Sequence, residues 1–192
     1  MEHPENGVNQ EKIRRAVEMM LEAIGEDPNR EGLRDTPRRV AQMYADILGR
    51  TNQEPEEELK LFYAREHDEM IIVKDIFFAS FCEHHMLPFI GKVHVAYVPR
   101  ENLTGLSKIA RVVDSLARRL QIQERLTTEI ADTIMRLLKP QGVLVVMEAE
   151  HTCMTIRGIK KPGSKAVTSA VRGVLRQQST RAEALSLITA KD

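Results

Sequence analysis

MIIVKDIFFASFCEHHMLPFIGKVHVAYVP, residues 70–99, contains two segments of strand composition on either side of a turn. The first segment, residues 70–78, is rich in β-branched and aromatic side chains, which favour strands. In the second, residues 92–97, apolar side chains alternate with more polar ones, as they do in a half-buried strand. We therefore expect an antiparallel pair of strands with residues 82–85 near its bend.

Apolar periodicity and Gly or Pro punctuation predict the remaining elements. Helices are expected over residues 13–24, 37–48, 107–120, 124–138 and 181–189, and further strands over residues 143–147 and 153–156. Gly25 is interpreted as the stop of the first helix and Thr36 as the cap of the second. We interpret residues 1–9 as disordered and residues 51–59 as a solvated connection.

This order, helices followed by ββααββ and a last helix, predicts an α+β fold. We expect a four-stranded, mostly antiparallel sheet with two helices on one face, preceded by an N-terminal helical segment. The expected division is residues 1–60 for that segment and residues 61–192 for the sheet domain. An open sheet has two edges that must be covered or paired, so assembly between subunits is expected.

Composition excludes several classes of protein. The 192-residue chain carries 28 basic and 28 acidic residues, whereas nucleic-acid-binding proteins usually show a basic surface. Aromatic residues make up 4% and Trp is absent, which disfavours base-stacking platforms. No segment approaches the ~18 apolar residues of a membrane span, and the first residues lack a signal-peptide pattern. We therefore expect a cytoplasmic protein that binds neither nucleic acid nor membrane.

The two cysteines of the chain each lie near a histidine. Cys82 precedes His85 by three positions, and Cys153 follows His151 by two. A Cys82, His85 and Cys153 set would leave one corner of a tetrahedral zinc ion open, as catalytic zinc sites do. His84 and His151 would then remain available for proton transfer. The alternatives are a disulfide, which a cytosolic setting disfavours, or two buried thiols that act as small hydrophobic groups.

Four motifs, in order, resemble those of the GTP cyclohydrolase I family. They are FCEHHMLPF with GKVHVAYVP at residues 81–99, GLSKIAR at 105–111, QIQERLT at 121–127, and HTC with RGI at 151–159. DTPRRV at residues 35–40 also fits, and the resemblance extends from about residue 12 to about residue 186.

The resemblance implies a zinc-dependent enzyme with the tunnelling fold. Enzymes of this family open the imidazole ring of GTP hydrolytically, release formate and form 7,8-dihydroneopterin triphosphate, the first step towards tetrahydrofolate or biopterin. The implied Zn²⁺ ligands are Cys82, His85 and Cys153. The implied catalytic residues are His151 as the acid that protonates guanine N7, His84 for proton transfers, and Ser107 for the later sugar rearrangement.

The family also implies which residues bind GTP. Glu124 would accept the two donors on the edge of guanine, N1–H and the exocyclic amine, with Gln123 beside it. By position alone, Glu124 would be an acidic residue that favours the start of a helix. The cations implied for the triphosphate are Lys108, Arg111, Arg157 and Arg39, and Lys108 lies at a helix start that suits anions.

The family further implies a cytoplasmic homodecamer with active sites shared between subunits. Glu124, Lys108 and Arg111 would then face the zinc of a neighbouring subunit, at least in part. One alternative is a zinc-dependent pterin synthase of the same tunnelling-fold group, which Cys82 and Cys153 disfavour because those enzymes bind metal mainly through histidines. The other is a non-catalytic, zinc-stabilised oligomeric binding protein, which a fourth protein ligand on the metal would favour.

Overall fold

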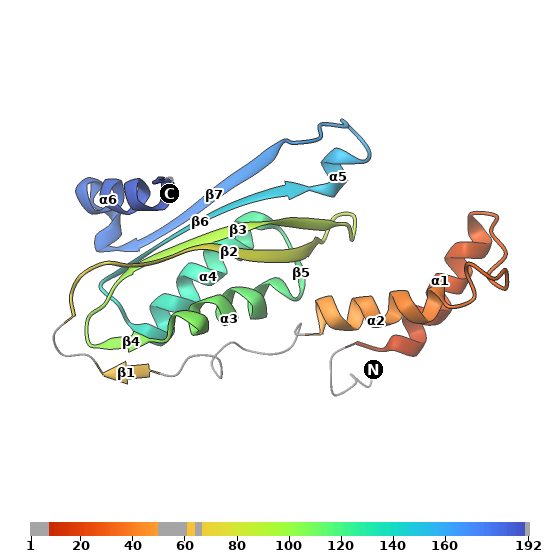
Figure 1. Cartoon of the computed structure of the whole chain (residues 1–192), viewed down its shortest axis with the longest axis horizontal. Coiled ribbons are helices and arrows are strands. Elements are labelled where there is room, and N and C mark those ends of the chain that lie inside the picture. The colour runs from red at the N-terminus through yellow and green to blue at the C-terminus, as the bar shows by residue number, and fades with distance from the viewer. Residues whose placement is uncertain (1–7, 50–60, 64–66, 191–192) are drawn as a thin grey trace. The chain divides into compact units, whose positions relative to one another are not determined.

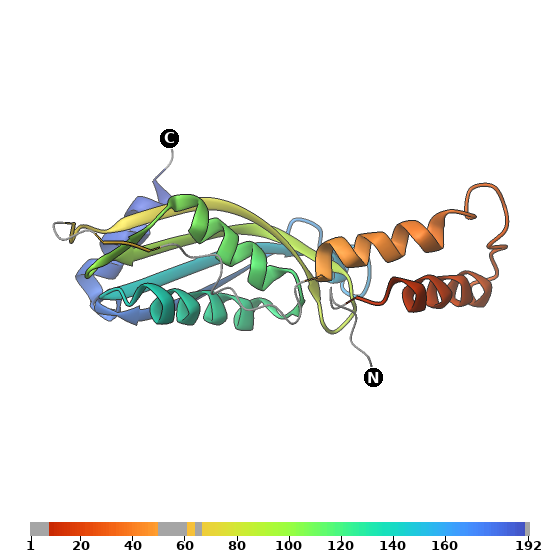
Figure 2. The ribbon, with the colours of Figure 1, turned by 90° about the horizontal axis from the view of Figure 1, so that it is seen from below.

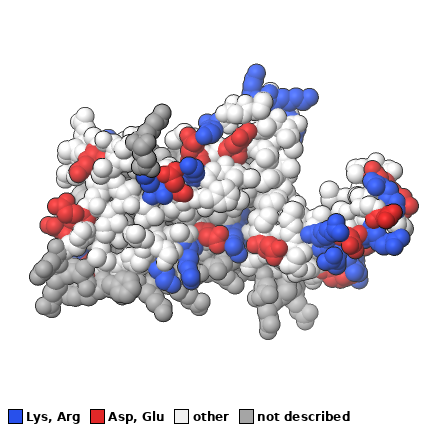
Figure 3. Space-filling view, viewed as in Figure 1, with Lys and Arg blue, Asp and Glu red and all other residues white. Residues whose placement is uncertain are grey.

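The computed structural model describes residues 8–49, 61–63 and 67–190, and the chain forms two compact units, residues 1–52 and 53–192. The predicted connection over residues 51–59 lies outside the described residues, as does nearly all of the predicted disordered start. No helix in the described part of the chain is long and apolar enough to cross a membrane. Basic and acidic side chains are interspersed on the face drawn in Figure 3, in keeping with the balanced composition.

Two helices, α1 (Gln10–Ala23) and α2 (Thr36–Leu48), pack against each other in the N-terminal unit. Asn9 caps α1 by accepting a hydrogen bond from the Lys12 N–H at 2.9 Å. The predicted stop at Gly25 is confirmed, since Gly25 follows the helix with a φ of +85°. The predicted cap of α2 was wrong by one position, because Asp35 precedes the helix and Thr36 is its first residue.

The second unit is built on a five-stranded sheet with the order β5-β2-β3-β6-β7 (Figure 1). Its strands are β2 (Ile71–Cys82), β3 (Pro88–Val98), β5 (Leu120–Gln121), β6 (Gly142–His151) and β7 (Lys165–Gly173). The four long strands pair antiparallel, whereas β5 pairs parallel with the end of β2. The predicted four-stranded sheet was therefore wrong in strand number. The sheet is mixed because two residues after the first sheet helix pair with Phe81 and Cys82.

Two helices, α3 (Leu106–Ala117) and α4 (Gln123–Leu138), lie side by side on one face of this sheet, as Figures 1 and 2 show. The main core lies between them and the sheet, with buried side chains that include Phe89, Val93, Tyr97, Ile109 and Ile130. The predicted pair of helices on one face is confirmed.

The other face is covered in part by α6 (Gln178–Thr189) and the short helix η2 (Val174–Arg176). Ala96 and Leu144 of the sheet pack there against Leu175, Ala184 and Ile188. Separately, β1 (Leu61–Tyr63) and β4 (Asn102–Thr104) form a short antiparallel ribbon.

The strand predicted over residues 153–156 was wrong. Residues Thr152–Thr155 form one turn of helix, α5, and the last strand, β7, begins at Lys165. The physical reason is topological: β6 extends to His151, so the chain must turn back immediately afterwards to pair antiparallel with β6. Gly158 and Gly163 take positive φ angles of +62° and +79° within this connection.

Gly91 allows β3 and β6 to approach closely, which generates a stability prediction. A Cβ at Gly91 would overlap the carbonyl oxygen of Glu148 and lie 2.7 Å from the Cα of Ala149. We expect Gly91→Ala to lower the free energy of unfolding by about 3 kcal/mol, because the backbone must move to relieve the overlap. Urea denaturation measures this change.

The matched control is Gly105→Ala, where the nearest atom to the new methyl group would be Lys108 Cγ at 3.8 Å. That substitution should cost less than about 1 kcal/mol. Equal losses for the two variants would contradict the close-approach explanation.

Candidate metal centre

The three predicted metal ligands come together at one end of the sheet. Cys82 is the last residue of β2, His85 lies in the turn that follows, and Cys153 lies in α5. Their donor atoms all lie within 4.8 Å of one another. Cys82 is buried, Cys153 is half-buried and His85 is exposed. Both cysteines are free, so the disulfide alternative is not found.

This donor set fits a zinc ion. Zinc–sulfur bonds of ~2.3 Å and a zinc–nitrogen bond of ~2.1 Å place tetrahedral ligand atoms roughly 3.5–3.8 Å apart, so only small side-chain adjustments are needed. Thiolate and imidazole are also ligands that zinc accepts readily. Within the described part of the chain, no fourth His, Cys, Asp or Glu joins the cluster.

Local hydrogen bonds shape the two segments that carry the ligands. In the turn after β2, the Cys82 N–H donates to Leu87 O at 2.9 Å, and the Met86 N–H donates to Cys82 O at 2.8 Å. In α5, the Thr152 hydroxyl donates to Pro88 O at 2.6 Å. Since Pro88 begins β3, this bond holds the helix that carries Cys153 next to the turn that carries His85.

The Cys153 thiol holds its proton more tightly than an ordinary cysteine. Burial, followed by the adjacent Cys82 sulfur, raises its pKa, and the Arg157 guanidinium opposes that rise. The arrangement therefore costs free energy when both sulfurs are charged, and a cation between them would remove that cost.

His151 is held by one aromatic ring and one amide. Its imidazole stacks on Phe89 with ring centroids 4.7 Å apart and an interplanar angle of 1°. Its Nε2 atom lies 2.8 Å from Gln123 Oε1. Burial lowers the pKa of His151, and the Glu124 carboxylate opposes that shift.

The surroundings of Gln123 determine which nitrogen of His151 carries hydrogen. The Gln123 amide nitrogen donates to Met147 O at 3.2 Å, to Ala166 O at 3.0 Å and to Thr168 Oγ1 at 3.1 Å. Two of these partners are carbonyl oxygens, which only accept, so Gln123 Oε1 is left to accept from His151. Nε2 of His151 therefore carries a proton in both charge states, and Nδ1 is the nitrogen that gains or loses one.

The predicted guanine-binding residues begin α4. Gln123 is buried and its amide is engaged within the protein, whereas Glu124 is exposed in the first turn. Glu124 acts electrostatically on His151 of the same chain, which does not support the expectation that Glu124 faces the zinc of a neighbouring subunit. The predicted proton-transfer residue His84 is exposed beside His85, with ring centroids 6.4 Å apart and an interplanar angle of 80°. The predicted roles of these side chains remain predictions.

The predicted phosphate-binding residues are spread over several elements. Arg157 follows α5 and acts electrostatically on Cys153. Arg39 lies in the N-terminal unit, where it forms an ion pair with Asp35 at 3.3 Å. Ser107, Lys108 and Arg111 lie in the first half of α3.

Within one chain, the start of α3 lies at a distance from the three candidate metal ligands. The far end of α3 leads to β5, and β5 pairs with Cys82. About 14 Å of helix lies between Lys108 and Ala117 at 1.5 Å per residue. The structure therefore does not bring Ser107 and Lys108 to the metal ligands of their own chain.

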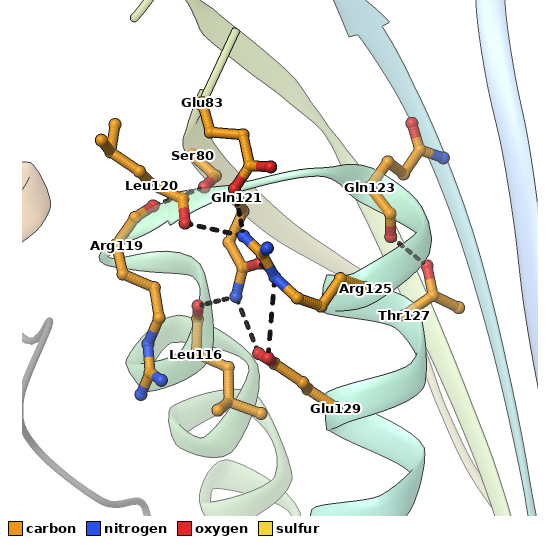
Figure 4. Close-up of polar contacts among 10 residues, drawn as sticks. All are labelled: Ser80, Glu83, Leu116, Arg119, Leu120, Gln121, Gln123, Arg125, Thr127 and Glu129. Atoms are coloured by element: carbon orange, nitrogen blue, oxygen red, sulfur yellow. Dashed lines mark hydrogen bonds and ion pairs between the residues drawn. The ribbon is translucent and has the colours of Figure 1, made fainter.

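Sequence reasoning missed a polar cluster beside the turn that carries the candidate ligand His85, formed by Glu83, Gln121, Arg125 and Glu129 (Figure 4). Arg125 donates to Glu83 at 2.6 Å across 42 positions of sequence. The only available signals were the place of Glu83 between two predicted ligands and of Arg125 within the QIQERLT motif.

Comparison with known proteins gives consistent matches. The family model described as GTP cyclohydrolase I matches residues 13–189. The chain is 61% identical to GTP cyclohydrolase 1 of Carboxydothermus hydrogenoformans, over 94% of this chain and 95% of that protein. It is 63% identical to the protein of that name from Pelotomaculum thermopropionicum, over 94% and 97% of the two chains. The chain is 56% identical to GTP cyclohydrolase 1 of Bacillus subtilis, over 96% of this chain and 98% of that protein. A solved structure of an archaeosine synthase QueF-like protein, in the apo form, has a TM-score of 0.46 at 19% identity, over 54% of this chain and 93% of that one.

The raised pKa of Cys153 predicts how zinc affinity depends on pH. Below that pKa the thiol is protonated, and zinc must displace the proton to bind. Affinity should therefore rise with pH, by about tenfold per pH unit for each proton displaced, between about pH 6.5 and 8.5. Competition with a coloured chelator measures the dissociation constant.

Two variants control this measurement. Cys153→Ser should weaken zinc binding and flatten the pH dependence, because one thiol proton no longer has to leave. His67→Ala removes a histidine outside the ligand cluster and should change neither quantity. A dissociation constant that stays the same across this pH range would contradict the prediction.

Proposed function

The chain belongs to the GTP cyclohydrolase I family and acts on GTP, and on that premise we propose the following reaction and roles. Residues 61–192 form a catalytic domain of the tunnelling-fold type that opens the imidazole ring of GTP hydrolytically. Formate is released and 7,8-dihydroneopterin triphosphate is formed. The observation that carries this proposal is the convergence of Cys82, His85 and Cys153 beside His151.

Zn²⁺ is the proposed cofactor, held by Cys82, His85 and Cys153. When bound, it would supply a Lewis acid that makes water a nucleophile near neutral pH. The two sulfurs and the imidazole match the composition of catalytic zinc sites, which use three protein ligands. The lack of a fourth ligand within the described part of the chain supports a reactive site over a purely structural one.

His151 is the proposed acid that protonates guanine N7. Its Nε2–H is committed to Gln123, which leaves Nδ1 as the atom that delivers the proton. Stacking on Phe89 restricts the plane of the ring, so the direction of transfer is set before substrate binds. His84 would move protons around the metal and the ribose, and Ser107 would assist the later rearrangement of the sugar.

Recognition of GTP would involve a carboxylate and several cations. Glu124 would accept N1–H and the exocyclic amine of guanine in parallel, and its exposure and place near His151 support this role. Gln123 would form the wall beside it. The triphosphate would bind the cations Lys108, Arg111, Arg157 and Arg39.

A homodecamer with shared active sites is the proposed assembly. The length of α3 supports sharing, because Ser107 and Lys108 are separated from the metal ligands of their own chain. The sheet ends at β5 on one side and β7 on the other, and unpaired edges of this kind favour pairing between subunits. A cytoplasmic setting and an entry step to tetrahydrofolate or biopterin synthesis complete the proposal.

Activity and metal content together test the role of His151. Incubation with GTP should yield formate and a pterin that fluoresces after oxidation. His151→Ala should lower turnover by ~100-fold or more, the scale of a positioned acid–base group, with zinc content unchanged by elemental analysis. His67→Ala is the control and should retain full turnover. Loss of zinc from the His151 variant would instead identify His151 as a ligand.

Mixing of two inactive variants tests the shared site. His151→Ala and Lys108→Ala chains, unfolded together and reassembled in equal amounts, should recover up to about one quarter of the wild-type activity, because random assembly completes that fraction of the sites. Each variant reassembled alone should stay inactive. A stable, fully active monomer near 21.8 kDa in sedimentation would contradict both the sharing and the ring.

A further inference from the structure

A side-chain hydrogen bond joins α4 to the turn after β2, which carries the candidate ligand His85. Glu83 lies between Cys82 and His85 but does not belong to the ligand cluster. Its Oε2 atom accepts a hydrogen bond from Arg125 Nη2 at 2.6 Å. Figure 4 shows this hydrogen bond between Glu83 and Arg125. Within the described part of the chain, no other side chain of the turn, residues 83–86, has a hydrogen bond to another element.

Arg125 is held in place by groups other than Glu83. Its Nε donates to Gln121 Oε1 at 2.9 Å, and its Nη2 also donates to Leu120 O at 3.1 Å. The Glu129 carboxylate lies 3.8 Å from its Nε. The guanidinium is therefore oriented towards Glu83 from its own side of the interface.

Gln121 is the buried centre of this cluster. Its amide nitrogen donates to Leu116 O at 3.2 Å and to Glu129 Oε2 at 2.8 Å. Both partners are acceptors, so its Oε1 must face Arg125. Since Gln121 is fully buried, rotation of this amide would leave polar groups without partners, and the orientation is strongly favoured.

The backbone ties the same residues to the turn. Gln121 pairs with Cys82 in the parallel ladder of β5 and β2, and the Glu83 N–H donates to Gln121 O at 3.0 Å. The Ser80 hydroxyl donates to Arg119 O at 3.2 Å just before the turn. The side-chain contact between Arg125 and Glu83 thus completes an attachment that the backbone begins.

We propose that Arg125 is a positioning residue for the metal centre, which acts through Glu83 to hold Cys82 and His85 at metal-binding separation before the metal arrives. This inference rests on the zinc site proposed above. An exposed ion pair alone stabilises little, and Glu83 and Arg125 are 35% and 40% exposed. The contact is effective because the cluster around Gln121 has already fixed the arginine, so little side-chain entropy is lost when it binds Glu83.

Zinc affinity, measured by chelator competition on metal-free protein, tests the inference without reference to turnover. Glu83→Ala and Arg125→Ala should each raise the zinc dissociation constant by about tenfold, the lower range for partners that orient metal ligands. The double variant should bind zinc no more weakly than either single variant, because both substitutions remove one contact. The zinc dissociation constant of Arg125→Lys should lie between those of the wild type and Arg125→Ala. Lysine keeps the positive charge but lacks the planar set of N–H donors of the guanidinium.

The matched control is the ion pair between Arg172 and Asp132, which also joins α4 to the sheet, at 2.7 Å. Asp132→Ala should leave zinc affinity at the wild-type value. If an alanine variant does not fold, the zinc dissociation constants of Glu83→Gln and Arg125→Lys are measured in its place.

Wild-type affinity in the Glu83 and Arg125 variants would overturn the inference and leave the proposed function intact. Additive losses in the double variant, or an equal loss in Asp132→Ala, would also overturn it, since they indicate independent effects or general destabilisation. Failure of the wild-type chain to bind zinc would overturn the proposed metal centre itself, together with this inference.

Discussion

The register between β2, β3 and β6 is the constraint on which the rest of the structure depends. Phe81 pairs with Pro88, and Phe89 pairs with His151. Because side chains alternate across a strand, a slip by one residue would move every core side chain to the opposite face. The buried residues of the central strands exclude such a slip. The same register brings the end of β2, the start of β3 and the end of β6 together, which is where the candidate ligands and His151 lie.

The first turns of α4 link this register to the chemistry of the site. Gln123, the first residue of α4, accepts a hydrogen bond from His151 and thereby fixes which ring nitrogen of His151 carries a proton. Arg125 of α4, together with Gln121 of the preceding strand β5, contacts Glu83 in the turn that carries the candidate ligand His85. Buried polar groups of this kind contribute little net stability when satisfied, but they disfavour every alternative orientation. A helix that packs on the sheet through apolar residues therefore also orients the groups at its start.

The proposed sharing of active sites has the same geometric origin. α3 runs along the sheet, with its end close to Cys82 and its beginning at the opposite end. A helix start favours anions because its backbone N–H groups are unpaired, and Ser107 and Lys108 lie there. If these residues bind phosphate near zinc, two chains must contribute to one site. Assembly would then be a requirement for catalysis as well as a way to cover sheet edges.

Local pattern by itself predicted three of the four long strands, the two sheet helices and the candidate ligand set, but not β7. Alternation over residues 92–97 and helical spacing over residues 124–138 depend on near neighbours, and two cysteines leave few possible ligand sets. Tertiary structure alone decided the two-residue strand β5, which is too short to show a period and exists because Cys82 pairs with it. It also decided the contact between Glu83 and Arg125. A hydrogen bond across 42 positions has no local signature, since its partners meet only after the sheet and α4 have packed.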